Sequence, residues 1–569
     1  MQTFSKKLLT FIRKPSFLAL IYFVVMSIGM TYPLIAKMGT AALGGGGDGT
    51  YFIWLIRWYQ KAMFQLKISP FFDPYLNYPQ GFDLASTDVT PAMVALALPG
   101  SLLFNNPTWG FNFAMLLSFI LSGWSMYLWV KHLTDDPYAG LVAGTVFAFL
   151  PYRMTHFFVG HLSLAGTQWF PFYFWGLFNL LKQEKFSWKP VLLAGIAAGL
   201  IGLTSPYYVY MTMLISVIFL LAYILFKGYQ RLKQAAFWKS LVAYGLVAGF
   251  LVGLSMWPYL DLNAQNGLQT HSLQLMNRYS ASLTDFFIPS IKQFLWGNWI
   301  DRTFHPGIFQ EATLYIGAVA FVLAIIAWVK RRQFRYPELL DIAMLVAAAG
   351  FVLALGIQLH WLGTTKGMPK FYLPSYYLYR YLPYFSKMRV MMRFGLFTLI
   401  FTSLMAGLGT YLLTKSASSN VRRWVGIGLL VLVCIDFYPG LQASDFHPIQ
   451  ARPVDTWLAA QPNTGAVAQF PFDEEGNQTQ VYDTLVYQKP FLGGNFNANT
   501  PEQYARIQPV MEAFPSQASV NLLRKLGVAY VVVDASRYQA YSSIDSEIQA
   551  LGLHLLHVSE EEYVYGLSK

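Results

Sequence analysis

One acidic residue within a glycine run is the first candidate for chemistry. Asp48 lies in the sequence Gly-Gly-Gly-Gly-Asp-Gly-Thr over residues 44–50. A carboxylate can act as a general base, and glycines on both sides of it let a bulky substrate approach the backbone closely. The alternative is a simple turn, since Asp-Gly is a common turn dipeptide. A phosphate-binding loop is excluded, because no Gly-Lys-Ser/Thr sequence follows.

Two histidines and a glutamate are further candidates. His156 and His161 follow Arg153 in a short polar segment, and Glu311 ends a longer one. Two histidines five residues apart do not share a helix face, so a two-histidine metal site on a helix is not expected. The alternatives without catalysis are hydrogen-bonded histidines at a membrane interface and a glutamate that stabilises a helix through its dipole.

A cluster of cations is the fourth candidate. Arg380, Lys387, Arg389 and Arg393 fall within fourteen residues. An anionic ligand is the simplest reason to gather them, and anchoring to anionic lipid headgroups is the competing explanation. The single cysteine, Cys434, excludes a disulfide scaffold and all cysteine-based metal motifs.

The composition shows what kind of elements must position these residues. The chain has 569 residues, of which 55% are hydrophobic and only 12% charged, whereas an ordinary soluble domain is about 25% charged. The mean hydropathy is +0.39. These values exclude a water-soluble globule, a disordered chain and a fibrous repeat. The net charge of +12 could suggest nucleic acid, but the positions of the charges indicate a membrane instead.

Apolar runs predict a polytopic α-helical membrane protein with about eleven transmembrane helices. A fourteen-residue run, 91–104, is too short to span and is expected to be a half-helix in the outer interface. All carboxylates lie outside the runs or at their ends, which disfavours transport through buried ion pairs. The eleven runs are 17–35, 109–130, 138–151, 164–181, 191–205, 207–226, 240–257, 312–329, 338–357, 394–413 and 424–438.

The distribution of Lys and Arg predicts the orientation. With the N-terminus in the cytoplasm, the inside segments hold 19 Lys/Arg in 63 residues and the outside segments hold 14 in 158. This bias fits the positive-inside rule. It places the first loop (37–90), a long loop (259–311) and the cationic loop (358–393) outside, so the four cations gather against the general trend.

The last part of the chain changes composition abruptly. Segments 465–470 and 528–533 have the pattern of strands, and 501–526 that of a helical stretch ending at Gly527. We therefore predict two domains, a transmembrane domain over 1–438 and a small extracytoplasmic α/β domain over 439–569.

The order of several loose motifs resembles a known group of enzymes. The chain is similar to the GT-C superfamily of membrane glycosyltransferases, which includes protein O-mannosyltransferases and lipid A aminoarabinose transferase, and is most similar to prokaryotic members with an α/β tail. The motifs are Thr31-Tyr32-Pro33, Gly47-Asp48-Gly49 followed by Trp54 and Trp58, Pro70-Phe71-Phe72-Asp73, Tyr78-Pro79-Gln80-Gly81, Phe149-Leu150-Pro151, Gly160-His161, and Pro383 with Arg389, Arg393 and Phe394.

The resemblance implies a reaction and its main residues. The family moves a sugar from a polyprenyl- or dolichyl-phosphate donor to an acceptor on the outer face, and its first outer loop supplies a catalytic aspartate, here Asp48. Arg389 and Arg393 correspond by position to the cations that bind the donor phosphate. Several members carry an Asp-x-Asp or Asp-Asp variant that this chain lacks. Metal dependence therefore stays open, and a divalent metal is compatible with the resemblance.

The chemistry assigns roles to the remaining candidates. Asp48 would act as general base with inversion at the anomeric carbon, and a phosphate leaving group needs no general acid. Substrate contacts are expected from Glu311, His156, His161, Arg153 and Asp88. Aromatic residues of the first loop would stack on sugar faces, and the half-helix 91–104 would border a groove for the lipid tail.

Partners and location follow from the same resemblance. The expected partners are a polyprenyl-phosphate sugar, the lipid bilayer and a glycan, glycolipid or protein acceptor, without nucleic acid. The expected location is the plasma membrane. A lipid-linked sugar flippase and a non-catalytic cell-envelope scaffold are the alternatives. The glycosyltransferase requires Asp48, Glu311 and Arg389 to converge in one place, whereas a scaffold does not.

Overall fold

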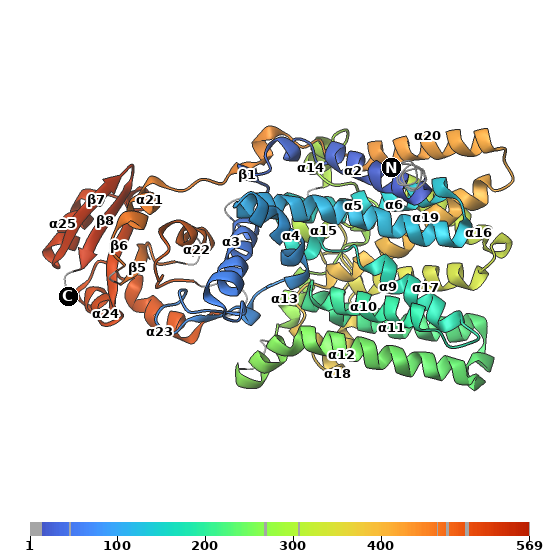
Figure 1. Cartoon of the computed structure of the whole chain (residues 1–569), viewed down its shortest axis with the longest axis horizontal. Coiled ribbons are helices and arrows are strands. Elements are labelled where there is room, and N and C mark those ends of the chain that lie inside the picture. The colour runs from blue at the N-terminus through green and yellow to red at the C-terminus, as the bar shows by residue number, and fades with distance from the viewer. Residues whose placement is uncertain are drawn as a thin grey trace, which may run out of the picture.

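The structure is a computed structural model that describes residues 14–44, 47–266, 270–304, 308–463, 465–473, 477–494 and 500–567. A bundle of roughly parallel helices forms most of the molecule, and the C-terminal residues extend from one end of it (Figure 1). Some residues used in the sequence analysis lie outside the described part, namely Lys6, Lys7 and Arg13 of the basic N-terminus and Gly45 and Gly46 of the glycine run.

Five helices in the described part are long and apolar enough to cross a membrane. They are α5 (Pro107–Thr134), α11 (Pro206–Lys227), α12 (Ala235–Asn266, of which Ala235–Leu262 is the candidate span), α17 (Pro337–Ala354) and α19 (Gly395–Thr414) with the turn before it. Shorter apolar helices accompany them: α2 (Pro15–Met30), α4 (Pro91–Leu103), α10 (Trp188–Gly202) and α16 (Ala318–Val329). The helices α6 (Pro137–Phe149), α9 (Phe170–Lys182) and α20 (Ser419–Phe437) occupy three further predicted runs.

Several of these helices are shorter than the apolar runs that predicted them. The run over 164–181 divides into α8 (Leu162–Ala165) and α9, and the run over 312–329 becomes helical only at Ala318. Proline opens many of the helices, because its fixed φ and missing N–H suit the first helical position. The half-helix predicted over 91–104 is α4. The total of eleven membrane crossings stays a prediction.

Helix α19 forms the centre of the bundle and is buried along nearly its whole length. Two glycines let neighbouring backbones approach it, as is common where membrane helices cross. A Cβ at Gly407 would lie 2.6 Å from the Cβ of Ala143 on α6, and one at Gly409 would lie 2.0 Å from the carbonyl oxygen of Leu323 on α16. The packing around α19 therefore requires glycine at both positions.

The C-terminal residues form a four-stranded sheet in the order β5-β6-β8-β7. β5 (Ala466–Phe470) pairs parallel to β6 (Val528–Asp534), and β8 (Glu562–Leu567) pairs antiparallel to both β6 and β7 (Leu553–Ser559). The two segments predicted as strands are thus β5 and β6. The single helical stretch predicted over 501–526 is wrong in one respect: it is two helices, α23 (Glu502–Met511) and α24 (Gln517–Lys525), because Ser516 caps a new helix after Pro515. The helices α21 (Pro453–Ala460) and α25 (Tyr541–Ala550) complete the unit.

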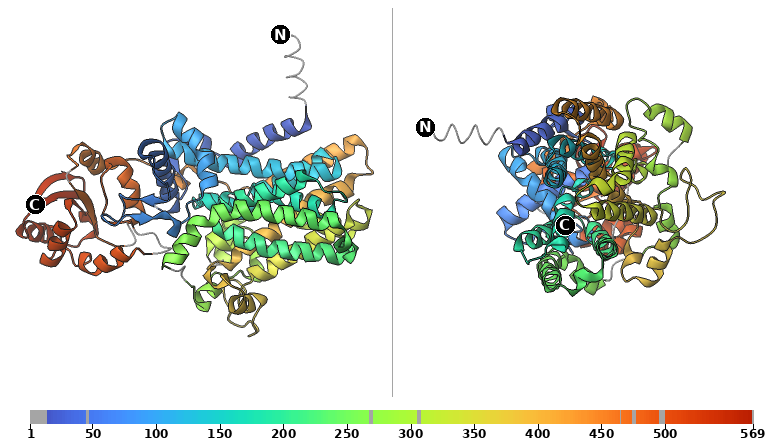
Figure 2. Two further views of the ribbon diagram at one scale, coloured as in Figure 1. Left: turned by 60° about the horizontal axis from the view of Figure 1, so that its bottom comes forward. Right: turned by 90° about the vertical axis from the view of Figure 1, so that its right-hand side faces the viewer.

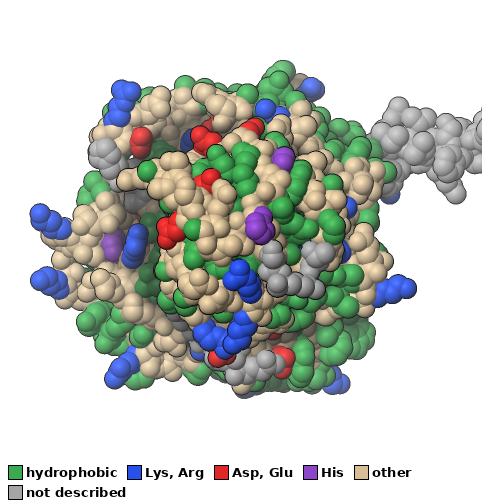
Figure 3. Space-filling view, turned by 90° about the vertical axis from the view of Figure 1, so that its left-hand side faces the viewer, with side chains coloured by type: hydrophobic (Ala, Val, Ile, Leu, Met, Phe, Trp, Pro, Cys, Tyr) green, Lys and Arg blue, Asp and Glu red, His purple; other side chains and the backbone are tan. Residues whose placement is uncertain are grey.

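This C-terminal part packs against the loop that follows the first helix. Its helix α22 (Asn477–Tyr487) packs on α3 (Asp48–Gln60), and Gln503 donates hydrogen bonds to the carbonyl oxygens of Asn77 and Tyr78 at 3.0 and 2.8 Å. A short ladder joins β1 (Ala41–Ala42) to β4 (His447–Pro448). Figure 2 shows the C-terminal part seated on the blue first-loop segments from a second direction. The face of the C-terminal part that points away from the bundle carries both acidic and basic side chains between apolar ones (Figure 3).

The contact between α19 and α16 gives a stability prediction. Replacing Gly409 by alanine forces a methyl group against the backbone of α16 and should lower the free energy of unfolding by about 1–3 kcal/mol. The measurement is the unfolding midpoint of the purified protein in detergent. Gly428→Ala on α20 is the matched control, because nothing lies within 4 Å of a Cβ there. Equal midpoints for the two variants would contradict the packing described.

Candidate active site

A hydrogen-bonded row of one carboxylate and two imidazoles forms the centre of the candidate site. Asp48 is the first residue of α3 and follows Gly47. His161 Nε2 lies 2.7 Å from Asp48 Oδ2, and its Nδ1 lies 2.9 Å from Nδ1 of His156. The Asp48 side chain keeps 45% of its surface exposed, whereas His156 is fully buried. The carboxylate is thus accessible and is held from behind by the histidines.

A tight turn explains how two histidines five residues apart come together. His156 lies in the last turn of α7 (Pro151–Phe158), and Gly160 adopts a φ of +77°. The chain then reverses, so the backbone N–H of His161 donates to the carbonyl oxygen of His156 at 2.8 Å. The expectation that the histidines do not share a helix face is correct, since the second lies beyond the helix end.

Three glycines near Asp48 have a packing role that the sequence analysis did not predict. A Cβ on Gly49 would lie 2.6 Å from the carbonyl oxygen of Leu43, and one on Gly160 would lie 2.7 Å from Cα of Gly49. Gly44, at a φ of +68°, would bring its Cβ within 2.3 Å of the carbonyl oxygen of Val159. These glycines therefore bring two loops into backbone contact, which places His161 beside Asp48.

The hydrogen bonds connect the three side chains in one row. When Asp48 is ionised, His161 donates to it from Nε2, and in the hydrogen bond between the two Nδ1 atoms the donor depends on the tautomers of the rings. Burial lowers the pKa of His156 well below its usual value, and the charges of His161 and Arg393 lower it further. His156 is therefore neutral, and its buried Nε2 has no hydrogen-bond partner among the described residues. The two imidazoles orient the Asp48 carboxylate.

A second carboxylate extends the cluster. Asp88 accepts a hydrogen bond from the hydroxyl of Ser163 at 3.3 Å. Burial raises the pKa of Asp88, the Arg393 guanidinium lowers it, the Asp48 carboxylate raises it and His161 lowers it. The hydroxyl of Tyr51 on α3 donates to the carbonyl oxygen of Asp88 at 3.4 Å, and Ser163 lies on α8, two residues after His161. The segments that carry Asp48, Asp88 and His161 therefore converge, and α15, which carries Glu311, packs on α7, which carries His156.

Glu311 and Arg393 form a buried ion pair beside these residues. Arg393 Nη2 lies 2.5 Å from Glu311 Oε1, and its Nε lies 3.2 Å from both carboxylate oxygens. Glu311 belongs to α15 (Phe309–Ala312), and Arg393 lies in the turn before α19. Two residues predicted to bind different parts of a substrate thus bind each other.

Tyr207 at the start of α11 connects the two arginines. The Arg393 guanidinium lies 4.7 Å from the centre of its ring, and its hydroxyl accepts a hydrogen bond from the backbone N–H of Arg389 at 3.1 Å. The Arg389 guanidinium lies 5.1 Å from the ring of Tyr279, and its Nε is buried without a hydrogen-bond partner in the described part of the chain. Arg389 thus has an unused donor close to the ion pair.

The sequence matches one family model over residues 18–385, described as "Domain of unknown function (DUF6311)". The chain belongs to the DUF6311 family. No curated protein matches it.

Solved structures share the fold at low sequence identity. The mycobacterial arabinofuranosyltransferase AftD superposes with a TM-score of 0.60 at 14% identity, over 97% of this chain and 40% of AftD. The DUF6311 chain thus spans less than half of that protein. ArnT from Cupriavidus metallidurans bound to undecaprenyl phosphate gives a TM-score of 0.49 at 12% identity, over 96% of this chain and 97% of ArnT. The oligosaccharyltransferase AglB from Archaeoglobus fulgidus, in complex with an inhibitory peptide and a dolichol-phosphate, gives 0.48 at 13%, over 97% of this chain and 74% of AglB.

The superposition on AftD, with a TM-score of 0.60, shows that this chain shares that protein's fold. The five helices of spanning length in the described part of the chain support a multi-pass membrane protein.

Arg153, which the sequence predicted to contact substrate, does not join the candidate site around Asp48. Its side chain has no exposed surface, and its guanidinium donates to the carbonyl oxygens of Ala148 and Ala165 and to the hydroxyl of Ser118. The ring of Phe119 lies 4.6 Å away. These contacts hold α7 against α5 and the end of α6. Arg153 thus packs three helices together, and the substrate contact predicted for it stays a prediction.

Two aromatic residues of the first loop, Trp54 and Trp58, also differ from expectation. Trp54 and Trp58 are buried and stack on each other with ring centres 6.4 Å apart, and the Trp58 indole N–H donates to the carbonyl oxygen of Pro70. They pack α3 into the fold and offer no exposed sugar-stacking surface.

Sequence reasoning missed Tyr207, Tyr279 and Ser163. Only the sequence Ser205-Pro206-Tyr207 at a predicted outer helix start gave a signal, because an aromatic residue there can face cations of a neighbouring loop.

Within the described ranges, no group of three or more His, Cys, Asp or Glu residues is arranged to hold a metal ion.

The ion pair gives a second stability prediction. Glu311→Ala leaves a buried guanidinium without its counter-charge and should cost about 3–5 kcal/mol of folding free energy. Replacing both partners by apolar residues, as Glu311→Leu with Arg393→Met, should cost less, because no buried charge remains. The unfolding midpoints of the two variants in detergent measure the difference. A double variant at least as unstable as Glu311→Ala would contradict the pairing.

Proposed function

We propose that this protein is a membrane glycosyltransferase that moves a sugar from a polyprenyl-phosphate donor to an acceptor hydroxyl on the outer face of the plasma membrane. The observation that carries the proposal is the accessible Asp48 carboxylate, held by His161 in one cluster with Asp88 and Arg393. The fold shared with the arabinofuranosyltransferase AftD supports it.

The acceptor reacts at Asp48. The carboxylate takes the proton of the acceptor hydroxyl while the hydroxyl oxygen forms a bond to the anomeric carbon of the sugar. The bond from that carbon to the phosphate oxygen breaks, and its electron pair leaves with the phosphate. One displacement at one carbon inverts the anomeric configuration. His161 keeps the carboxylate oriented, and the hydrogen bond between the Nδ1 atoms of His161 and His156 holds the His161 ring in place.

The donor phosphate lies at the two arginines. Arg389 supplies the unpaired Nε, and Arg393 engages Glu311 through Nε and Nη2, with no hydrogen bond from its Nη1 among the described residues. Charge-assisted hydrogen bonds from both guanidinium groups would stabilise the leaving phosphate. Glu311 holds Arg393 in place and, with Asp88, accepts hydrogen bonds from sugar or acceptor hydroxyls.

The orientation follows from the distribution of Lys and Arg. The N-terminus lies in the cytoplasm, and residues 439–569 form an extracytoplasmic domain. This domain is attached to the first loop through α22 and Gln503, so it supports the segment that carries Asp48. It also lies where an acceptor glycan, glycolipid or protein would arrive.

The base assignment predicts the outcome of one substitution. Asp48→Asn preserves the shape of the side chain but removes its basicity, so transfer should fall by about 100-fold or more. The assay uses the purified full chain with a panel of polyprenyl-phosphate sugars that includes an arabinofuranose. The control is Asp83→Asn, an exposed carboxylate of the same loop, which should leave transfer unchanged. Near-normal transfer by Asp48→Asn would reject the assignment.

The proposed binding site for the donor phosphate gives a separate prediction. Arg389→Ala removes a donor that binds the phosphate in the ground state and binds it more strongly in the transition state, where negative charge develops on it, so KM for the lipid donor should rise and kcat should fall. Arg302→Ala on α14 (Gly297–Phe304) is the control, because this arginine is exposed and lies in another loop of the predicted outer side. Steady-state kinetics with varied donor distinguish the two constants. If neither changes in Arg389→Ala, the phosphate binds elsewhere.

A further inference from the structure

The chain segment that leads to Arg389 and Arg393 carries cations that the candidate site does not use. Residues 358–393 contain six Lys or Arg residues and no Asp or Glu. Arg389 and Arg393 belong to the candidate site. Within segment 361–384, by contrast, three cations point to the surface and are exposed, namely Lys366, Lys370 and Arg380. We refer to these three as the exposed cations of segment 361–384.

Large aromatic side chains accompany the exposed cations. Six of them are at least 49% exposed: Trp361, Phe371, Tyr372, Tyr377, Tyr381 and Tyr384. In helix α18 (Pro374–Tyr381), Tyr377 lies three and four residues before Arg380 and Tyr381, so the three side chains share one face of the helix. Exposed tyrosine and tryptophan beside cations are typical of the boundary between membrane and water.

Hydrogen bonds hold segment 361–384 across the ends of two candidate spans. The hydroxyl of Ser375 donates to the carbonyl oxygen of Leu353 near the end of α17 at 3.1 Å. The hydroxyl of Tyr210 near the start of α11 donates to the carbonyl oxygen of Pro383, next to the segment's last residue, at 2.6 Å. Figure 1 and the left view of Figure 2 show α18 at the edge of the bundle. The segment therefore lies where α11 and α17 reach the membrane surface, on the side of the candidate site.

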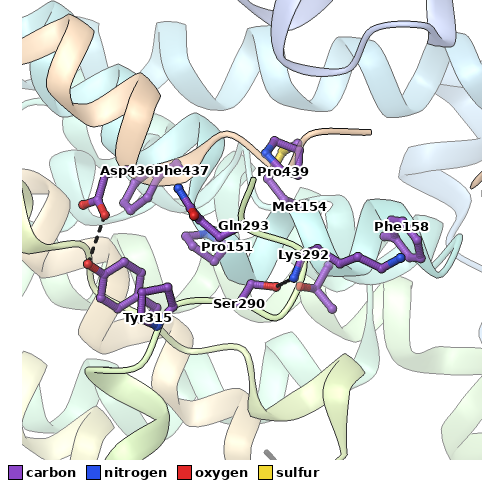
Figure 4. A pocket seen from close by; sticks show the side chains of 12 residues that line it. Pro151, Met154, Phe158, Ser290, Lys292, Gln293, Tyr315, Asp436, Phe437 and Pro439 are labelled. Carbon is purple, nitrogen blue, oxygen red and sulfur yellow. Dashed lines mark hydrogen bonds between the residues drawn. The ribbon is translucent and has the colours of Figure 1, made fainter. Parts of the chain in front are cut away.

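The exposed cations have no counter-charge within the part of the chain that the structure describes. None of the three forms an ion pair there. Lys292 of the preceding outer loop provides a contrast. Its Nζ lies 4.1 Å from the ring centre of Phe158 and 3.5 Å from Asp445 Oδ1, and Figure 4 shows this side chain extended toward Phe158. The exposed cations of segment 361–384 are thus available to an anionic partner.

The aromatic side chains limit what this anionic partner can be. A water-soluble anion would pair with the cations but would leave six large aromatic rings in water. At a membrane surface the same rings lie at the level of the lipid headgroups, with their apolar part in the bilayer and their polar atoms in water. Lys and Arg beside an anionic membrane surface are attracted to it as well. Anionic headgroups therefore account for both kinds of residue.

We propose that segment 361–384 binds the headgroups of anionic phospholipids in the outer leaflet through its three exposed cations. The two explanations that the sequence offers for the cationic loop then apply to different residues. Arg389 and Arg393 lie in the candidate site, and the exposed cations contact lipid. The bound headgroups hold the segment against the membrane beside the chain that continues to Arg389. The proposal does not depend on the proposed function, since lipid binding is measured without transfer.

Fluorescence quenching by spin-labelled lipids in nanodiscs tests the proposal. The full chain carries Cys434→Ser, which removes its one cysteine, and Thr365→Cys at an exposed position beside Lys366, labelled with bimane. The nanodiscs contain phosphatidylcholine and phosphatidylglycerol, with equal amounts of spin label on one lipid or the other. Spin-labelled phosphatidylglycerol should quench at least twofold more strongly, because the anionic lipid gathers at the segment. Equal quenching by both lipids, or quenching by neither, would overturn the proposal.

Charge variants show where the preference arises. It should disappear when the three exposed cations are replaced together (Lys366→Gln, Lys370→Gln and Arg380→Gln). The matched control removes the same charge from exposed positions of α23 and α24 in the C-terminal part and should keep the preference (Arg506→Gln, Arg524→Gln and Lys525→Gln). High salt should weaken the preference, since it screens exposed charges. A preference that survives the first triple variant, or that both triple variants lose, would contradict the site.

Discussion

The contact between Asp48 and His161 is the interaction on which the candidate site depends. A carboxylate at the start of a helix is already favoured by the helix dipole, but the dipole does not orient it. Orientation comes from an imidazole at 2.7 Å, itself held by a second imidazole in the buried wall. The pair can form only because Gly44, Gly49 and Gly160 let two loops meet backbone to backbone. A methyl group at any of these glycines would separate the proposed base, Asp48, from His161, which orients it.

Charge balance provides the second constraint. The buried guanidinium of Arg393 is neutralised by Glu311, yet it still acts on Asp88 and His156. The site therefore holds alternating charges in a partly dry environment, where electrostatic interactions are stronger than in water. Such an arrangement suits a reaction in which a proton moves to a carboxylate while negative charge develops on a phosphate a short distance away. Tyr207 contacts both Arg389 and Arg393, and so connects the proposed site of the lipid phosphate to the Glu311–Arg393 ion pair.

Much of the helical architecture could be predicted from the sequence, because apolar runs of spanning length are a strong signal and proline marks the helix starts. The half-helix α4 and the strands β5 and β6 were predicted for similar local reasons. Asp48 stood out because a carboxylate among glycines is unusual, and the cations stood out because they oppose the charge bias of the loops. The contacts between these residues could not be predicted, since nothing local indicates that Glu311 pairs with Arg393 across eighty residues. Arg153 and the tryptophans of α3 were misassigned for the same reason: a polar or aromatic residue in a loop is exposed or buried according to tertiary packing alone.

A cryo-electron microscopy structure of the protein with a polyprenyl-phosphonate sugar, which cannot be cleaved, would test the central claim most directly. The account predicts the phosphonate on Arg389 and Arg393, with the anomeric carbon facing the Asp48 carboxylate across a space for one acceptor hydroxyl. An analogue bound with its anomeric carbon remote from Asp48, or with its phosphonate on other cations, would contradict it.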